Sequence, residues 1–235
     1  ERMDQLATRC AEDYAKCGYP ADAAAILVCE LEGTATEVAA QRARVEGLLD
    51  RFGASEVRVS RDEAERLGFW KGRKSAFPAI GRIAPDYYCM DGTIPRRELS
   101  RVLTRIAELS TEFGLPVANV FHAGDGNLHP LIAYDANDDE QLHRAETLGA
   151  RILELYIEVG GTVTGEHGVG VEKLDGMCVQ FDTPELETFH RLKAAFDPDG
   201  LLNPGRAVPT LQRCAEFGAM HVHANRLPHP ELERF

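Results

Sequence analysis

Two histidines flank a glycine-rich tetrapeptide near the middle of this 235-residue chain: His122 and His129, with residues 124–127 (Gly-Asp-Gly-Asn) between them. On a straight strand two residues seven positions apart would lie about 23 Å from each other, and on a helix roughly 10.5 Å along the axis. Glycine and asparagine readily adopt positive φ, so the tetrapeptide predicts a tight turn that folds the chain back. We expect this turn to bring both imidazoles to one point.

Residues 164–170 (Thr-Gly-Glu-His-Gly-Val-Gly) form a second unusual stretch, in which glycines surround Glu166 and His167. Dense glycine indicates that the backbone approaches another group closely. Together with His122 and His129, the Glu166 carboxylate completes a set of two imidazoles and one carboxylate, typical of a catalytic divalent-metal site with open coordination positions. Neighbouring side chains point apart in extended backbone, so if Glu166 faces the metal, His167 is available nearby as a base.

A plainer interpretation exists for each residue taken alone. A single histidine in a chain of this size is more often a core or surface residue with satisfied hydrogen bonds than a metal ligand. Asp125, between two glycines, is by default a turn former. The combination of the two motifs favours the metal site over these separate explanations.

The elements that must position these residues alternate between helix and strand. The spacing of apolar residues, with capping and stop signals, predicts helices over residues 1–19, 34–51 (with a capping box from Thr34 to Glu37), 61–76, the stretch after Pro95, and 137–159. Strands are predicted over residues 24–32 (buried), 56–59, 86–91, 117–122 and 131–134. This alternation predicts an α+β fold, with helices on one face of a largely antiparallel sheet.

Composition narrows the class of protein. The formal net charge is −12 and hydrophobic residues make up 44% of the chain, as in an ordinary globular protein. An acidic chain has no electrostatic reason to bind nucleic acid or an anionic membrane surface. No apolar run approaches the roughly 20 residues of a spanning helix. The chain begins with Glu-Arg-Met-Asp, without a signal-peptide pattern, so we expect a cytoplasmic protein and a piece of a longer one.

Three motifs in order carry a family resemblance: residues 122–129, residues 165–170 followed by Lys173, and residues 196–205 (Phe-Asp-Pro-Asp-Gly-Leu-Leu-Asn-Pro-Gly). They resemble the C-terminal half of the FAD-linked 2-hydroxyacid oxidases and dehydrogenases, which have the vanillyl-alcohol-oxidase type of fold. The resemblance covers essentially the whole chain. The stretch after Pro209 is most similar to the flavin subunit of the members that oxidise glycolate.

The resemblance implies two parts: a ferredoxin-like cap domain that binds substrate (residues 1–195), and a C-terminal segment (residues 196–235) that contacts an FAD-binding domain. The chain contains no Gly-x-Gly-x-x-Gly or comparable phosphate-binding segment. FAD is therefore expected to be held mostly by a domain absent from this chain. We expect the chain on its own to be inactive.

The same resemblance implies roles for individual residues. His122, His129 and Glu166 match the positions that hold a divalent metal, zinc or manganese. The metal would coordinate the hydroxyl and carboxylate of a 2-hydroxyacid and lower the pKa of the hydroxyl. His167 matches the general base that removes the hydroxyl proton as a hydride passes to FAD.

Two further positions are candidates for substrate and cofactor binding. Arg73 matches a carboxylate-binding arginine of the family, and an arginine fork suits a carboxylate; the alternative is a solvated helix face. Asn203 matches a position near the flavin, although a turn before Pro204 explains it almost equally well. Residues 88–91 lack the lysine found in dehydrogenases of larger diacids, which favours a small monoacid, with oxidation of glycolate to glyoxylate as the expected reaction.

Alternatives remain at this point. The chain could belong to a D-lactate dehydrogenase, or to a module that binds a metal or a partner without catalysis. The resemblance also implies a second flavin subunit and an iron–sulfur subunit as partners, and through them a peripheral place at the inner membrane. For the end of the chain, with Cys214, His221 and His223, we favour a surface tail over a second metal site or an iron–sulfur contact.

Overall fold

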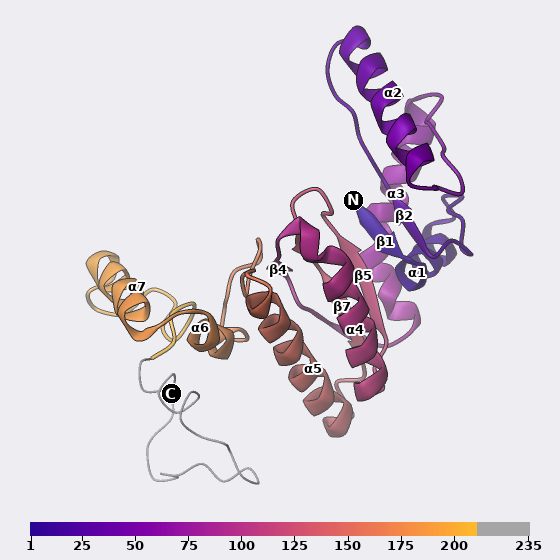
Figure 1. Ribbon diagram of the computed structural model, residues 1–235. Coiled ribbons are helices and arrows are strands. Elements are labelled where there is room, and N and C mark those ends of the chain that lie inside the picture. Colours follow the sequence, from indigo (N-terminus) through magenta and orange to yellow (C-terminus); the bar gives the residue numbers. More distant parts are fainter. Residues whose placement is uncertain (211–235) are drawn as a thin grey trace. The chain divides into compact units, whose positions relative to one another are not determined.

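Figure 1 shows the computed structural model, which describes residues 1–210. The chain divides into two compact units. The first comprises residues 1–83 and 118–120, and the second comprises residues 84–117 and those from 121 onward. Cys214, His221 and His223 lie outside the described residues.

The first unit combines short strands with three helices: β1 (Arg2–Asp4), α1 (Gln5–Ala15), β2 (Ala25–Leu27), α2 (Ala35–Arg51) and α3 (Glu63–Ala79), followed by the 3-10 turn η1 (Ile80–Arg82). β1 pairs with β2 in antiparallel register, Met3 opposite Ile26. α1 packs against α3, and the segment after α1 lies so close to α3 that a Cβ on Gly72 would lie 2.4 Å from the ring of Tyr19. The core is therefore built from small and medium side chains, and those that are fully buried include Met3, Ala7, Ala11, Ala76, Ala79 and Ile80.

Local capping signals define the helices of this unit. Asp4 caps α1: its Oδ1 accepts the N–H of Ala7 at 2.9 Å, and its Oδ2 accepts the N–H of Asn119 at 2.7 Å. Thr34 and Glu37 form the predicted reciprocal capping box at the start of α2. No residue of α2 is buried, so capping and intrahelical hydrogen bonds supply most of what orders this helix within the unit.

The second unit contains the remaining elements: β3 (Asp86–Cys89), β4 (Gly92–Thr93), η2 (Arg96–Glu98), α4 (Leu99–Phe113), β5 (Val117–Phe121, with residues 118–120 in the first unit), β6 (Asn127–Leu128), β7 (Pro130–Tyr134), α5 (Asp139–Glu158), α6 (Leu174–Gln180) and α7 (Thr183–Phe196). β3 pairs with β7, and β4 with β6, both in antiparallel register. α4 and α5 pack against each other (Figure 1). Their apolar faces join the strands in one core that includes Met90, Val102, Ile106, Phe121, Leu128, Ile132, Leu148, Ile152 and Tyr156.

This architecture confirms the predicted α+β class with a largely antiparallel sheet, and the predicted long helices agree with α1 to α5 within a few residues at each end. One strand prediction is wrong, and another is correct only in part. Residues 56–59 form no strand; Glu56 and Arg58 pair with each other there, and Arg58 also donates to the carbonyl of Gly18. The apolar run at 24–32 yields only the three residues of β2, of which Leu27 is 57% exposed. Within residues 1–210, no helix combines the length and the apolar character that crossing a membrane requires.

Candidate metal centre

The predicted turn after β5 is present. The N–H of His122 donates to the carbonyl of Asn127 at 3.0 Å, and the N–H groups of Asp125 and Gly126 both donate to the carbonyl of His122 at 3.1 Å. Gly126 has φ +75°, and a Cβ there would lie 2.3 Å from the carbonyl oxygen of Ile94. A residue with a side chain does not fit at this point, so glycine is required for the chain to fold back.

The turn brings the two predicted histidine ligands together, and Glu166 joins them from the loop after α5. The rings of His122 and His129 lie 5.3 Å apart between centroids. Oε1 of Glu166 is 3.4 Å from Nε2 of His122 and 3.0 Å from Nε2 of His129. One ligand atom from each residue lies within 4.8 Å of the others, and the set of two imidazole nitrogens and one carboxylate oxygen suits a divalent ion.

Exposure differs sharply between the three residues. The side chain of His129 is 2% exposed, that of His122 is 31% exposed and that of Glu166 is 51% exposed. The cluster is therefore buried at His129 and reaches the surface of its unit at Glu166. Such an arrangement fixes one residue of the cluster in the core and leaves the other side accessible to solvent.

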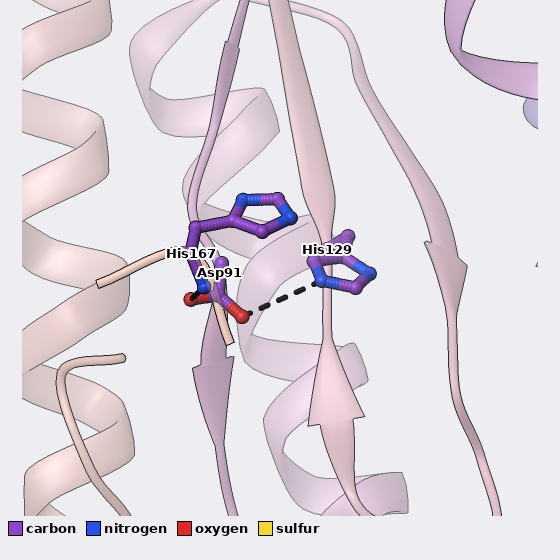
Figure 2. A group of neighbouring side chains, drawn as sticks. All are labelled: Asp91, His129 and His167. Carbon is purple, nitrogen blue, oxygen red and sulfur yellow. Dashed lines mark hydrogen bonds and ion pairs between the residues drawn. The ribbon is translucent and has the colours of Figure 1, made fainter. Parts of the chain in front are cut away.

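His167 does not point away from Glu166, as extended backbone would require. Its ring stacks on that of His129, with centroids 4.9 Å apart and planes inclined by 13°. Its Nε2 lies 3.7 Å from Oε1 of Glu166. Figure 2 shows the imidazoles of His129 and His167 beside each other, next to the carboxylate of Asp91. The expectation of diverging side chains is wrong because the backbone of this loop is curved.

The curvature has its source in Asp91, which follows β3 and is fully buried. Its Oδ2 accepts the N–H of Gly165 at 2.9 Å and that of His167 at 3.1 Å. A Cβ on Gly165 would lie 2.7 Å from Oδ1 of Asp91 and 2.1 Å from Oδ1 of Asn127. The close approach that dense glycine predicted is therefore made to the protein's own carboxylate and amide groups.

The buried Asp91 carboxylate is kept ionised. Burial by itself raises its pKa, but the hydrogen bonds from His129 and from the N–H groups of Gly165 and His167, with the nearby charge of Lys173, hold the pKa well below its usual range. Lys173 is 4% exposed, and its Nζ donates to the carbonyl of Asp91 at 2.6 Å and to Oδ2 at 3.2 Å. Neither residue was predicted to belong to the site; in the sequence, the one indication is that Lys173 closely follows the Gly-Glu-His-Gly motif.

The other two predicted site residues lie elsewhere in the chain. Arg73 is a buried residue of α3 in the first unit, where its guanidinium pairs with the Glu1 carboxylate at 3.0 Å. Asn203 is an exposed residue in the segment after α7 and has φ +46°. Their roles toward substrate and flavin stay predictions, as does the proposed boundary between residues 195 and 196.

The fold and the cluster define a class: an α+β domain that presents two histidines and a glutamate in a geometry suited to a divalent ion. A family model described as "FAD linked oxidases, C-terminal domain" matches residues 1–207. The chain therefore belongs to the family of C-terminal domains of FAD-linked oxidases. The resemblance noted from the three motifs is confirmed.

Individual relatives agree with this assignment. The chain is 63% identical over its full length to the glycolate oxidase subunit GlcD of Escherichia coli K12, of which it covers 47%, and 35% identical to GlcD of Bacillus subtilis, with 88% of the chain and 44% of the relative covered. It is 30% identical to a mitochondrial D-lactate dehydrogenase (cytochrome) of Arabidopsis thaliana, with 78% of the chain and 33% of the relative covered. The chain thus spans about half the length of the GlcD relatives it matches, or less for the D-lactate dehydrogenase.

Solved structures share the fold at low identity. A p-cresol methylhydroxylase with bound substrate superposes with a TM-score of 0.62 at 15% identity, over 90% of this chain and 46% of that one. A 4-ethylphenol oxidase of Gulosibacter chungangensis gives a TM-score of 0.60 at 13% identity, over 90% of this chain and 48% of that one. These likenesses support the fold alone.

Proposed function

We propose that this chain is the substrate-binding half of an FAD-dependent 2-hydroxyacid dehydrogenase that oxidises glycolate to glyoxylate. The observation that carries the proposal is the convergence of His122, His129 and Glu166 with His167 stacked alongside. The identity of 63% to a glycolate oxidase subunit supports the choice of glycolate. Because the chain spans about half of that relative, the FAD-binding domain is expected to come from outside this chain.

The residues of the cluster divide the chemistry between them. His122, His129 and Glu166 would hold the divalent ion, zinc or manganese. When bound, the ion would supply a Lewis acid that lowers the pKa of a hydroxyl, and FAD would supply the two-electron acceptor. His167, whose side chain is 46% exposed, accepts the proton of the substrate hydroxyl on its ring and passes it to water.

Arg73 is proposed to bind the carboxylate of the substrate. Its guanidinium already engages a carboxylate in the first unit, that of Glu1, through Nε at 3.0 Å. An arginine offers five N–H donors in a planar fork, so it orients a carboxylate more strictly than lysine does. Asn203 is proposed to lie near the flavin, where its side-chain amide would donate a hydrogen bond.

The metal assignment is tested by elemental analysis of the complete flavoprotein. We expect about one divalent ion per chain in the wild type, by the single donor set proposed, and loss of the ion in His122→Ala and Glu166→Gln. His143→Ala is the matched control, because His143 is an exposed histidine of α5 outside the cluster. Retention of the ion in both ligand variants would refute the assignment.

The substrate is tested by comparing kcat/KM for glycolate and D-lactate in the same preparation. A higher value for glycolate supports the proposal, and a higher value for D-lactate assigns the chain to the D-lactate dehydrogenases.

We further propose a cytoplasmic enzyme that works with a second flavin subunit and an iron–sulfur subunit at the inner membrane, on the family resemblance alone. Co-purification of two such subunits with the tagged protein tests this, and isolation without them contradicts it.

A further inference from the structure

Among the described residues of the second unit, two groups of side chains meet the distance requirement for a metal: His122, His129 and Glu166, and a second set of Asp91, His129 and His167. Both sets share His129, whose Nε2 lies 3.0 Å from Oε1 of Glu166 and 3.4 Å from Oδ1 of Asp91. The hydrogen bonds around Asp91 indicate which of the two carboxylates is the ligand.

Oδ2 of Asp91 is surrounded by donors. It accepts hydrogen bonds from Oγ1 of Thr164 at 2.9 Å, from the N–H groups of residues 165–167 at 2.9–3.2 Å, and from Nζ of Lys173 at 3.2 Å. Oδ1 accepts the N–H of Glu166 at 3.2 Å and lies 3.4 Å from Nε2 of His129. Oδ2 would give up several of these hydrogen bonds if it coordinated an ion. Oδ1 lies farther from Nε2 of His129, at 3.4 Å, than Oε1 of Glu166 does, at 3.0 Å.

We propose that Asp91 is a positioning residue, which acts with Lys173 to set the direction of the Glu166 carboxylate and is not itself a metal ligand. The inference deepens the proposed function and rests on it, since it concerns the same metal site. Three consecutive backbone N–H groups, those of residues 165–167, point at one carboxylate. The backbone must curve around Asp91 to achieve this, and so the side chains of Glu166 and His167 both reach His129.

Lys173 closes the other end of this loop. It lies immediately before α6, and its ammonium group holds both the backbone carbonyl and the side chain of Asp91. Both ends of the loop from Thr164 to Lys173 are therefore hydrogen-bonded to Asp91. The lysine charge also balances a fully buried carboxylate, which would be costly to leave unpaired.

The test measures Mn²⁺ affinity of the complete flavoprotein, by titration followed with electron paramagnetic resonance. Outer partners of metal ligands change metal affinity by about 10- to 100-fold when they are removed. We expect a weakening of about that size in Asp91→Asn and in Lys173→Met, with flavin absorbance retained. Lys173→Arg keeps the charge and is expected to recover most of the affinity, which a loss of general stability would not explain.

Several outcomes would overturn the proposal. A folded Asp91→Asn protein with wild-type Mn²⁺ affinity contradicts it. If that variant does not fold, Thr164→Val removes one hydroxyl donor to Oδ2 and serves in its place; we expect a several-fold weaker affinity, and no change contradicts the proposal. Loss of Mn²⁺ in His167→Ala, with retention in His122→Ala, would make Asp91 a ligand of the other set.

A readout that needs no metal separates this inference from the proposed function. In the metal-free protein we expect slow hydrogen exchange at the amides of Gly165, Glu166 and His167, and faster exchange by at least about tenfold in Asp91→Asn, because hydrogen-bonded amides exchange only on local opening. If His122→Ala leaves Mn²⁺ binding intact, the proposed metal site fails. If exchange at these amides does not change in Asp91→Asn, the positioning role fails regardless of the metal.

Discussion

The imidazole of His167 stacks on that of His129, with 4.9 Å between ring centroids and 13° between the planes. The two rings differ in exposure: the side chain of His129 is 2% exposed and that of His167 is 46% exposed. His129 thus provides a fixed surface that orients His167, while His167 itself stays accessible to solvent. An accessible imidazole held in this way suits the proton acceptor proposed for His167.

Replacing His167 by alanine in the complete flavoprotein is expected to lower kcat for glycolate by about 10²- to 10⁴-fold, the usual contribution of a general base. His167 is not part of the proposed ligand set, so the content of divalent ion should stay near that of the wild type. Stopped-flow measurement of flavin reduction gives the rate, and elemental analysis gives the ion content. Wild-type flavin reduction in His167→Ala would remove this residue from the mechanism.

The turn between His122 and His129 offers a pair of matched substitutions. Gly126→Ala forces a side chain at φ +75° and places a Cβ 2.3 Å from the carbonyl oxygen of Ile94. We expect it to cost about 1–3 kcal/mol of the free energy of unfolding, from overpacking and backbone strain, and to weaken metal binding. Gly124→Ala, where no atom lies within 4 Å of the added Cβ, should be nearly neutral in both measurements.

Chemical denaturation of the two variants compares their stabilities, and metal titration compares their sites. Equal losses in Gly124→Ala and Gly126→Ala would show that the close contact with Ile94 is not what makes glycine necessary. A loss of stability in Gly126→Ala without loss of metal affinity would show that the turn does not control the spacing of the two histidines.

The parts of the fold that the sequence predicted are governed by interactions between near neighbours. The capping box of Thr34 and Glu37 joins residues three positions apart, and the turn from His122 to Asn127 is closed within six residues. Propensity and capping are visible in such short stretches. The meeting of His122 and His129 was predictable for the same reason.

The features that escaped prediction depend on groups distant in the sequence. Asp91 contacts residues 164–167 across more than 70 positions, and nothing near Asp91 in the sequence indicates that partner. The strand predicted at residues 56–59 fails for the same reason, because alternation of apolar residues indicates a strand only where another strand lies alongside. No such strand pairs with these residues in the described part of the chain.

The role of Arg73 can be separated from its pairing with Glu1. If Arg73 binds the substrate carboxylate, Arg73→Lys should raise KM for glycolate by about tenfold or more, since the fork geometry is lost, with a smaller effect on kcat. Glu1→Gln removes the competing carboxylate and should lower KM or leave it unchanged. Steady-state kinetics of the complete flavoprotein measure both. If the ion pair is purely structural, both variants will lose thermal stability and neither will change KM.

The segment after α7 contains a carboxylate whose behaviour with pH is open to test. The side chain of Lys193 bonds the buried Asp197 carboxylate, which also accepts the N–H of Leu201 at 2.8 Å and that of Leu202 at 2.9 Å. The hydrogen bond from Lys193, followed by those backbone donors, lowers the pKa of Asp197 from its ordinary value of 3.8.

Because the pKa of Asp197 is lowered in the folded state, its carboxylate stabilises the segment after α7 fully above pH 3.8, the ordinary pKa of the group. This stabilisation declines as the pH falls further. We expect the amide resonances of Leu201 and Leu202 to stay constant above that pH and to move together below it. In Asp197→Asn they should differ from the wild type at neutral pH and lose this transition. Asp199→Asn, at an exposed position two residues on, is the control that should leave it intact. A transition that persists in Asp197→Asn would assign the titration to another group.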